Sequence, residues 1–152
     1  MNKAFDSAAY CYLCRARAAE MRMARKQSQL DGLRDIVTNI TPKLSDMPSS
    51  SSPNPQRMES LTCKIVDMEA DLARDADKLA EIRMDIALLI CKVPDTNQQE
   101  ILRERYLNLR TWQEIMTATG YSKSSVFRLH NAALAKLNRI IALDDDLAKV
   151  GT

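Results

Sequence analysis

The sequence of 152 residues is poor in the residues that interrupt helices or fill aromatic cores. It has 3 Gly and 5 Pro, and aromatic residues make up 5% of it. Gly and Pro are the residues that helices tolerate least, and Ala, Leu, Met, Arg, Lys, Glu and Gln dominate what remains. The composition therefore predicts an all-α protein, and the length allows one or two small domains.

Long apolar runs are also missing. No stretch reaches the roughly 18 apolar residues that a membrane-spanning helix requires. The N-terminal segment is short, mixed and then highly charged, and it lacks the continuous apolar stretch of a signal peptide. We therefore expect a cytoplasmic protein with no membrane partner.

Histidine is almost absent, which limits the kinds of site that the chain can build. The only His is His130, and there is no Gly-rich phosphate loop or nucleophile elbow, so we do not expect an enzyme. Cys11 and Cys14 have the C-x-x-C spacing of zinc and redox sites, but Cys63 and Cys91 do not form a second close pair. We therefore expect inert, half-buried cysteines, a surface His130, and no metal or cofactor.

Two breaks divide the sequence. Ser45–Arg57 contains four consecutive Ser and three Pro, which predicts a loop. Pro94 ends one helix, and a polar residue among positions 95–97 caps the next. We predict a long helical hairpin over residues 1–93 with its loop at 45–57, a second domain over 94–143, and an acidic tail over 144–152.

The segment between these breaks carries a heptad repeat. Counting every seventh residue from Met58 and from Leu61 gives two series in which only Asp75 is not apolar. Such a seam is typical of a coiled-coil helix, which would be about 50 Å long at roughly 1.5 Å per residue. The series are Met58, Ile65, Leu72, Leu79, Ile86 and Val93, and Leu61, Met68, Asp75, Ile82 and Leu89.

A weaker repeat precedes the loop and predicts a second long helix that ends near Pro42. Since neither apolar stripe is stable alone in water, we expect the two helices to pair as an antiparallel coiled-coil hairpin. Self-association of two chains into a homodimer along the same seam is the alternative. The weaker series are Ala9, Ala16, Met23, Leu30, Val37 and Leu44, and Tyr12, Ala19, Lys26, Leu33 and Ile40.

The segment after Pro94 carries the functional hypothesis. A helix over 97–109 is followed by a short helix that Thr111 caps, with Glu114 three residues on, as in a capping box. Gly120 supplies the left-handed residue that ends this short helix, and Ser122 caps a longer one. A short helix, a tight turn and a longer helix match a helix-turn-helix.

In a helix-turn-helix, one face of the second helix packs on the domain and the other meets DNA. The expected inner stripe is Val126, Leu129, Ala133 and Leu137, continued by Ile140 or Ile141. The expected outer face is Lys123, Ser124, Phe127, Arg128 and Asn131, residue types that touch phosphates or base edges. Arg110 and Lys136 flank this face as phosphate contacts, and Thr111 completes the set of DNA-binding candidates. The alternative is a three-helix bundle with a solvated outer face.

The stretch "ILRERYLNLRTWQEIMTATGYSKSSVFRLHNAALAKLNRI" resembles the fourth conserved region of sigma-70-type sigma factors. The matching pieces are Arg103 to Tyr106, Thr111 to Ile115, and Ala133 to Leu137. The resemblance implies that Lys123, Ser124, Phe127 and Arg128 contact DNA, and that RNA polymerase is a partner. Sigma factors usually carry more charge at Ser124 and Phe127, so their promoter sequence is not implied.

The stretches "ITPKLSDMP" and "KIVDMEADL" resemble those of small phage and prophage proteins of Gram-positive bacteria. In these proteins a long helical part precedes a sigma region 4-like end, which implies a transcriptional regulator that binds double-stranded DNA. One alternative is a protein-interaction module that acts on RNA polymerase or a phage protein through the coiled coil. Another is a small terminase-like protein of DNA packaging.

Overall fold

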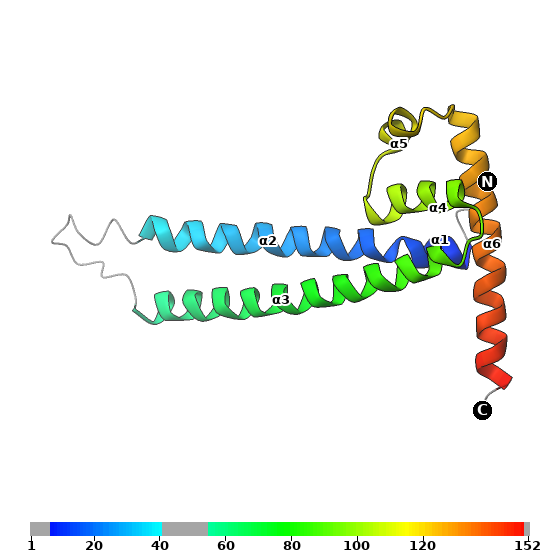
Figure 1. Cartoon of the computed structure of the whole chain (residues 1–152). Coiled ribbons are helices and arrows are strands. Elements are labelled where there is room, and N and C mark those ends of the chain that lie inside the picture. The colour runs from blue at the N-terminus through cyan, green and yellow to red at the C-terminus, as the bar shows by residue number, and fades with distance from the viewer. Residues whose placement is uncertain (1–6, 41–54, 151–152) are drawn as a thin grey trace. The chain divides into compact units, whose positions relative to one another are not determined.

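The computed structural model describes residues 7–40 and 55–150. Within these ranges the chain is helical with no β-strand, so the all-α prediction is confirmed (Figure 1). No helix in either range is long and apolar enough to cross a membrane. The chain divides into a terminal unit, Met1–Ala18 with Ala80–Thr152, and a central unit, Ala19–Leu79.

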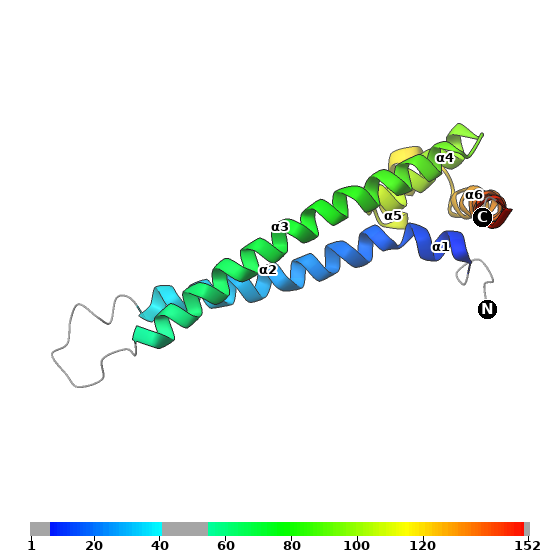
Figure 2. The ribbon, with the colours of Figure 1, turned by 90° about the horizontal axis from the view of Figure 1, so that it is seen from below.

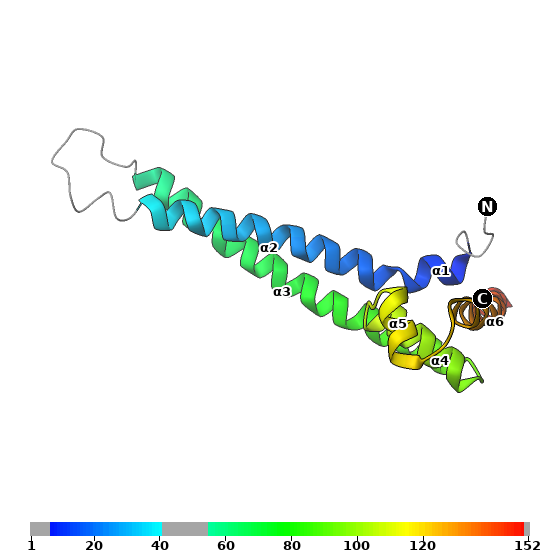
Figure 3. The same ribbon diagram turned by 90° about the horizontal axis from the view of Figure 1, so that it is seen from above.

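The central unit consists of two long helices. α2 spans Arg15–Ile40 and α3 spans Pro55–Cys91, and both continue into the terminal unit. Within the central unit they lie side by side in all three views (Figures 1, 2 and 3). Lys26 is ion-paired with Asp75, and Arg34 Nη2 lies 2.6 Å from Glu69 Oε1. Since the partner moves back along α3 as the chain advances along α2, the two helices run in opposite directions.

The heptad positions coincide with the less exposed side of α3. Every a and d position from Met58 to Val93 is buried or half-buried, while most of the residues between them are exposed. On α2, Ala19 and Leu30 are buried, and Met23, Leu33 and Val37 are half-buried. The expected Leu44 lies outside the described residues, as do residues 45–54 of the expected loop. Pro55–Arg57, predicted as loop, are the first turn of α3.

The terminal unit packs short helices against one long one. α1 spans Ala8–Leu13, α4 spans Thr96–Leu102, α5 spans Trp112–Thr119 and α6 spans Lys123–Val150. Both α1 and α4 pack against α6, and the N–H of Ala9 donates to Asn138 Oδ1 at 2.9 Å. Ile101, Ile115 and Val126 form a buried cluster between α4, α5 and α6. Burying each of these side chains contributes about 1.5–3 kcal/mol to folding.

One predicted helix is interrupted. The sequence predicts a continuous helix over 97–109, but α4 is followed by a π-helix, η2, over Arg103–Leu107. The N–H of Asn108 donates to the carbonyl of Arg103 at 2.9 Å, which is the wider i→i−5 spacing. Arg83 Nη2 donates to the carbonyl of Leu107 at 2.9 Å, so that this carbonyl has a partner. Compared with an α-helical turn, the π turn therefore contains one extra residue before Asn108.

The end of α6 differs from the expected acidic tail. Residues 144–150 continue α6, and Asp144 Oδ2 lies 2.6 Å from Lys92 Nζ. Both side chains of this pair are about half exposed, so its contribution to stability is small. It nevertheless places Asp144 of α6 beside Lys92, which directly follows α3.

Candidate nucleic-acid interface

The turn between α5 and α6 is built by local capping. The hydroxyl of Thr111 accepts from the N–H of Glu114 at 3.3 Å, and the carboxylate of Glu114 accepts from the N–H of Thr111 at 2.7 Å. These bonds form the predicted capping box, and they lower the pKa of Glu114. Thr111 is exposed, but its hydroxyl is also bonded to Glu114, so the cap already engages the group expected to meet a phosphate.

Gly120 ends α5 as predicted. Its φ is 72° and its ψ is 5°, in the left-handed region that favours glycine, and its N–H donates to the carbonyl of Met116 at 2.9 Å. Ser122 begins α6, because its hydroxyl accepts from the N–H of Ser125 at 3.2 Å. The same hydroxyl lies 3.2 Å from that of Ser124. The two helices are thus separated by three residues whose backbone and caps define the turn.

α6 has one buried and one exposed side. Its buried residues are Val126, His130, Ala133, Leu134 and Leu137. Lys123, Ser124, Arg128 and Asn131 are exposed, and no acidic residue occurs from Ser122 to Leu143. The side of α6 that faces away from the core is therefore polar or basic along its first turns.

The remaining candidates are less freely available. Phe127 and Lys136 are half-buried, and the ring of Phe127 lies 4.8 Å from that of Trp112 between centroids. Arg110 is exposed, but its Nε lies 3.0 Å from Glu104 Oε2. Phe127 and Arg110 therefore have partners within the chain before any DNA is bound.

Arg139 is a residue that the sequence reasoning missed. It is exposed, and it lies eleven residues after Arg128, which is close to three helical turns and hence the same side of α6. Continuing the periodicity of the exposed side beyond Asn131 would have found it. With Arg139 included, the basic side extends about 17 Å from Arg128 at roughly 1.5 Å per residue.

His130 is not the surface residue that the sequence predicted. It has no exposed area, and its Nε2 lies 2.7 Å from the hydroxyl of Tyr106. The rings of Tyr106 and Trp112 pack on it, with centroids 5.8 and 4.9 Å away. Burial lowers the pKa of His130 to about 4 and raises that of Tyr106 above its ordinary value. The prediction was wrong because His130 lies on the buried side of α6, where the hydroxyl of Tyr106 on η2 is its hydrogen-bonding partner.

The cysteines differ in part from the expectation of half-buried positions. Cys14 is half-buried, but Cys11, Cys63 and Cys91 are exposed, and all four are free thiols. Within residues 7–40 and 55–150, no group of three or more His, Cys, Asp or Glu side chains is placed to hold a metal. Cys11, Cys63 and Cys91 are therefore surface thiols, and Cys14 alone fits the expectation.

Comparison with known proteins assigns the chain to a family. No curated protein and no solved structure matches it. The family model described as "Protein of unknown function (DUF1492)" matches residues 42–138, which is more than half of the chain. The matched range contains α4, η2, α5 and the exposed residues at the front of α6. The chain therefore belongs to the DUF1492 family.

Proposed function

We propose that the chain is a phage or prophage transcriptional regulator that binds double-stranded DNA through the front of α6. The observation that supports this most is the side of α6 opposite its buried residues. Arg128 and Asn131 are exposed there, and Lys123 is exposed in the first turn, immediately after the turn made by left-handed Gly120. A helix of this kind fits a major groove about 12 Å wide, where Arg pairs with guanine and Asn with adenine.

The exposed side chains fall into two groups, those that read bases and those that contact phosphates. In this proposal Arg128 and Asn131 read base edges, while Lys123, Lys136, Arg139 and Arg110 contact phosphates. The role is binding without catalysis, and the chain acts in the cytoplasm, where the DNA is. RNA polymerase and a second copy of the chain are the protein partners that the sequence resemblance and the heptad seam suggest.

Salt dependence of duplex binding tests the proposal. If three or four cationic side chains displace counterions from phosphates, the slope of log affinity against log salt is about −2.7 to −3.6. Selection of bound sequences from a random duplex pool identifies the operator. Light scattering on the same sample gives the stoichiometry.

The decisive variant is Arg128→Ala. It should weaken binding to the selected duplex by about 1–3 kcal/mol and relax the base preference at one position. Arg74→Ala is the matched control, because Arg74 is an exposed Arg of α3 that is ion-paired with Asp71. Equal, salt-insensitive binding by both variants would contradict the proposal.

A second candidate function is a protein-interaction module in which the α2–α3 pair binds RNA polymerase or a phage protein. The observation that favours it is the exposure of large apolar side chains in the central unit: Met21, Ile36 and Val66. Single exposed apolar residues are common, so this observation is weaker than the one at α6. A purified chain that ignores duplex DNA at low salt and co-purifies with RNA polymerase would favour this candidate.

A further inference from the structure

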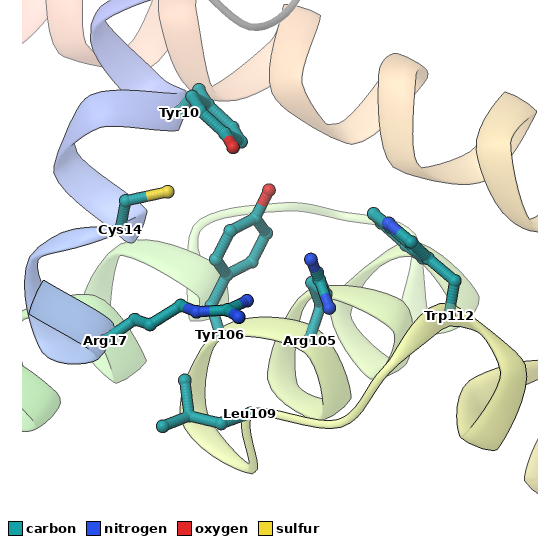
Figure 4. Close-up of a pocket in the computed structure, with 7 residues that line it drawn as sticks. All are labelled: Tyr10, Cys14, Arg17, Arg105, Tyr106, Leu109 and Trp112. Carbon is teal, nitrogen blue, oxygen red and sulfur yellow. The ribbon is translucent and has the colours of Figure 1, made fainter. Parts of the chain in front are cut away.

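A pocket separate from the front of α6 lies in the terminal unit. Its volume is about 170 Å³. Tyr10 of α1, Arg17 of α2 and Cys14 between them line it on one side (Figure 4). Arg105, Tyr106, Leu109 and Trp112 line it on the other. The lining thus combines two guanidinium groups with aromatic and aliphatic surface and contains no carboxylate.

The two arginines differ in how they are held. Arg105 Nη1 donates to the carbonyl of Arg110 at 2.8 Å, and its guanidinium lies over the ring of Trp112 at 4.6 Å. Arg105 is therefore positioned before any ligand arrives. Arg17 is exposed and has no hydrogen bond or ion pair with any other described residue. Its guanidinium is available to a ligand.

Glu104, the acid next to Arg105 in the sequence, has other partners. Glu104 precedes Arg105, but its carboxylate accepts from Asn108 Nδ2 at 2.8 Å and lies 3.0 Å from Arg110 Nε. The positive charge of Arg105 and Arg17 is thus left without a counter-charge among the pocket residues. Guanidinium groups in this state bind carboxylates and phosphates through paired N–H···O bonds.

The backbone beside the pocket is irregular at two places. Arg105 and Tyr106 belong to the π-helix η2, and Leu109 has a φ of 55°, which is uncommon for a residue with a side chain. Such irregularities are found often at functional sites, where the surrounding structure holds them in place. Here both direct residues into the same pocket.

The size and lining indicate which anion fits. A cavity of about 150 Å³ holds one benzene ring, so this pocket accommodates a ligand of one-ring size. The ring of Tyr106 and the side chain of Leu109 provide apolar surface, which inorganic phosphate would not use. We propose that the pocket binds a small planar carboxylate, whose oxygens meet Arg17 and Arg105 and whose ring lies against Tyr106 and Trp112.

The single tryptophan makes this proposal directly testable. Trp112 is the only Trp of the chain and lines the pocket, so its fluorescence reports on a ligand that binds there in the absence of DNA. Benzoate is the probe, benzamide is its uncharged isostere, and inorganic phosphate is the anion without a ring. We expect benzoate to give a saturable change at about 1 mM and the other two to bind at least about tenfold more weakly. Ligand-observed NMR with the same compounds records binding that leaves the fluorescence unchanged.

Substitutions of Arg17 test whether its charge binds the carboxylate. Arg17→Gln should weaken benzoate at least about tenfold, because one charged hydrogen-bonding partner is lost. Arg17→Lys should restore part of the affinity. Arg139→Gln is the matched control, because Arg139 is exposed on α6 outside the pocket and should leave benzoate binding unchanged while weakening DNA. Arg17 is exposed, so its substitution does not disturb folding.

Three results would overturn the proposal. They are no saturable benzoate binding by either method, equal binding of benzamide, and full affinity in Arg17→Gln. Failure of DNA binding would leave the proposal untouched, since no step of it involves duplex DNA.

Discussion

The Nζ amine of Lys26 on α2 donates a hydrogen bond to the carboxylate of Asp75 on α3. Each is the one charged residue in the heptad series of its helix. The bond from Lys26 is the main cause of the lowered pKa of Asp75. Two charges that would each disturb an apolar seam are thus matched with each other, and the match defines one register of the two helices.

Reversing one charge of this pair should lower stability, and reversing both should restore it. Lys26→Asp places two carboxylates together and should lower the Tm by about 2–4 °C. The double variant Lys26→Asp with Asp75→Lys recovers most of the loss, as measured by circular dichroism during heating. Because the pKa of Asp75 is lowered, the native pair stabilises the fold above the unfolded pKa of Asp and loses this effect as pH falls through the folded value. A double variant less stable than the single one would contradict the pairing.

Two glycines should respond in opposite ways to the same substitution. Gly120→Ala forces a side chain into φ 72° and should lower the free energy of unfolding by about 1–2 kcal/mol, although the added Cβ meets open space. Gly32→Ala, in α2 and also with open space, should raise it by about 0.5–1 kcal/mol. Urea unfolding measures both. Loss of stability in both variants would show that helix propensity and φ are not the controlling factors.

The single histidine predicts a pH effect of known sign. Burial lowers the pKa of His130 from 6.5 to about 4, so the unfolded chain binds a proton at a higher pH than the folded one. Stability is therefore complete above pH 6.5 and falls as pH decreases toward 4, with a total loss of about 3 kcal/mol. Urea unfolding between pH 7 and 4.5 records most of this loss, and the variant His130→Gln separates it from the carboxylates that begin to titrate at about pH 4.5.

His130→Gln is the matched variant for that experiment. It cannot take up the proton in this range, so its stability should change little between pH 7 and 4.5, even though it is lower at pH 7. An unchanged pH dependence in His130→Gln would mean that other groups cause the effect.

Phe127 should affect DNA affinity without affecting its salt dependence. Phe127→Ala removes an apolar contact and should weaken duplex binding by about tenfold, while the salt slope stays the same because no phosphate contact is lost. Since the ring also packs on Trp112, circular dichroism must show that the variant keeps its helices. A shallower salt slope would contradict an apolar role.

Local and periodic features were predictable from the sequence. The heptad spacing identified the less exposed side of α3, and the residue types at Thr111, Glu114 and Gly120 identified the cap and the turn. These features depend on interactions within a few residues. The π turn is also local, but no residue type marks it in the sequence. The pairing of His130 with Tyr106 joins residues 24 apart, so spacing along the chain gave no indication of it. The pocket was missed for the same reason, because Arg17 and Arg105 come from separate segments.

The π-helix also has a consequence for how the family can vary. Removing one residue from Arg103–Leu107 would convert this turn to α geometry and leave the chain after it in nearly the same orientation relative to α4, because the wider turn is what accommodates the extra residue. The side chains of the turn itself, including Tyr106 beside His130, would change direction, while the short helix that begins at Trp112 would keep its place against Ile101. Relatives should therefore lose one residue here more readily than inside α4, where a deletion would rotate everything after it by about 100°.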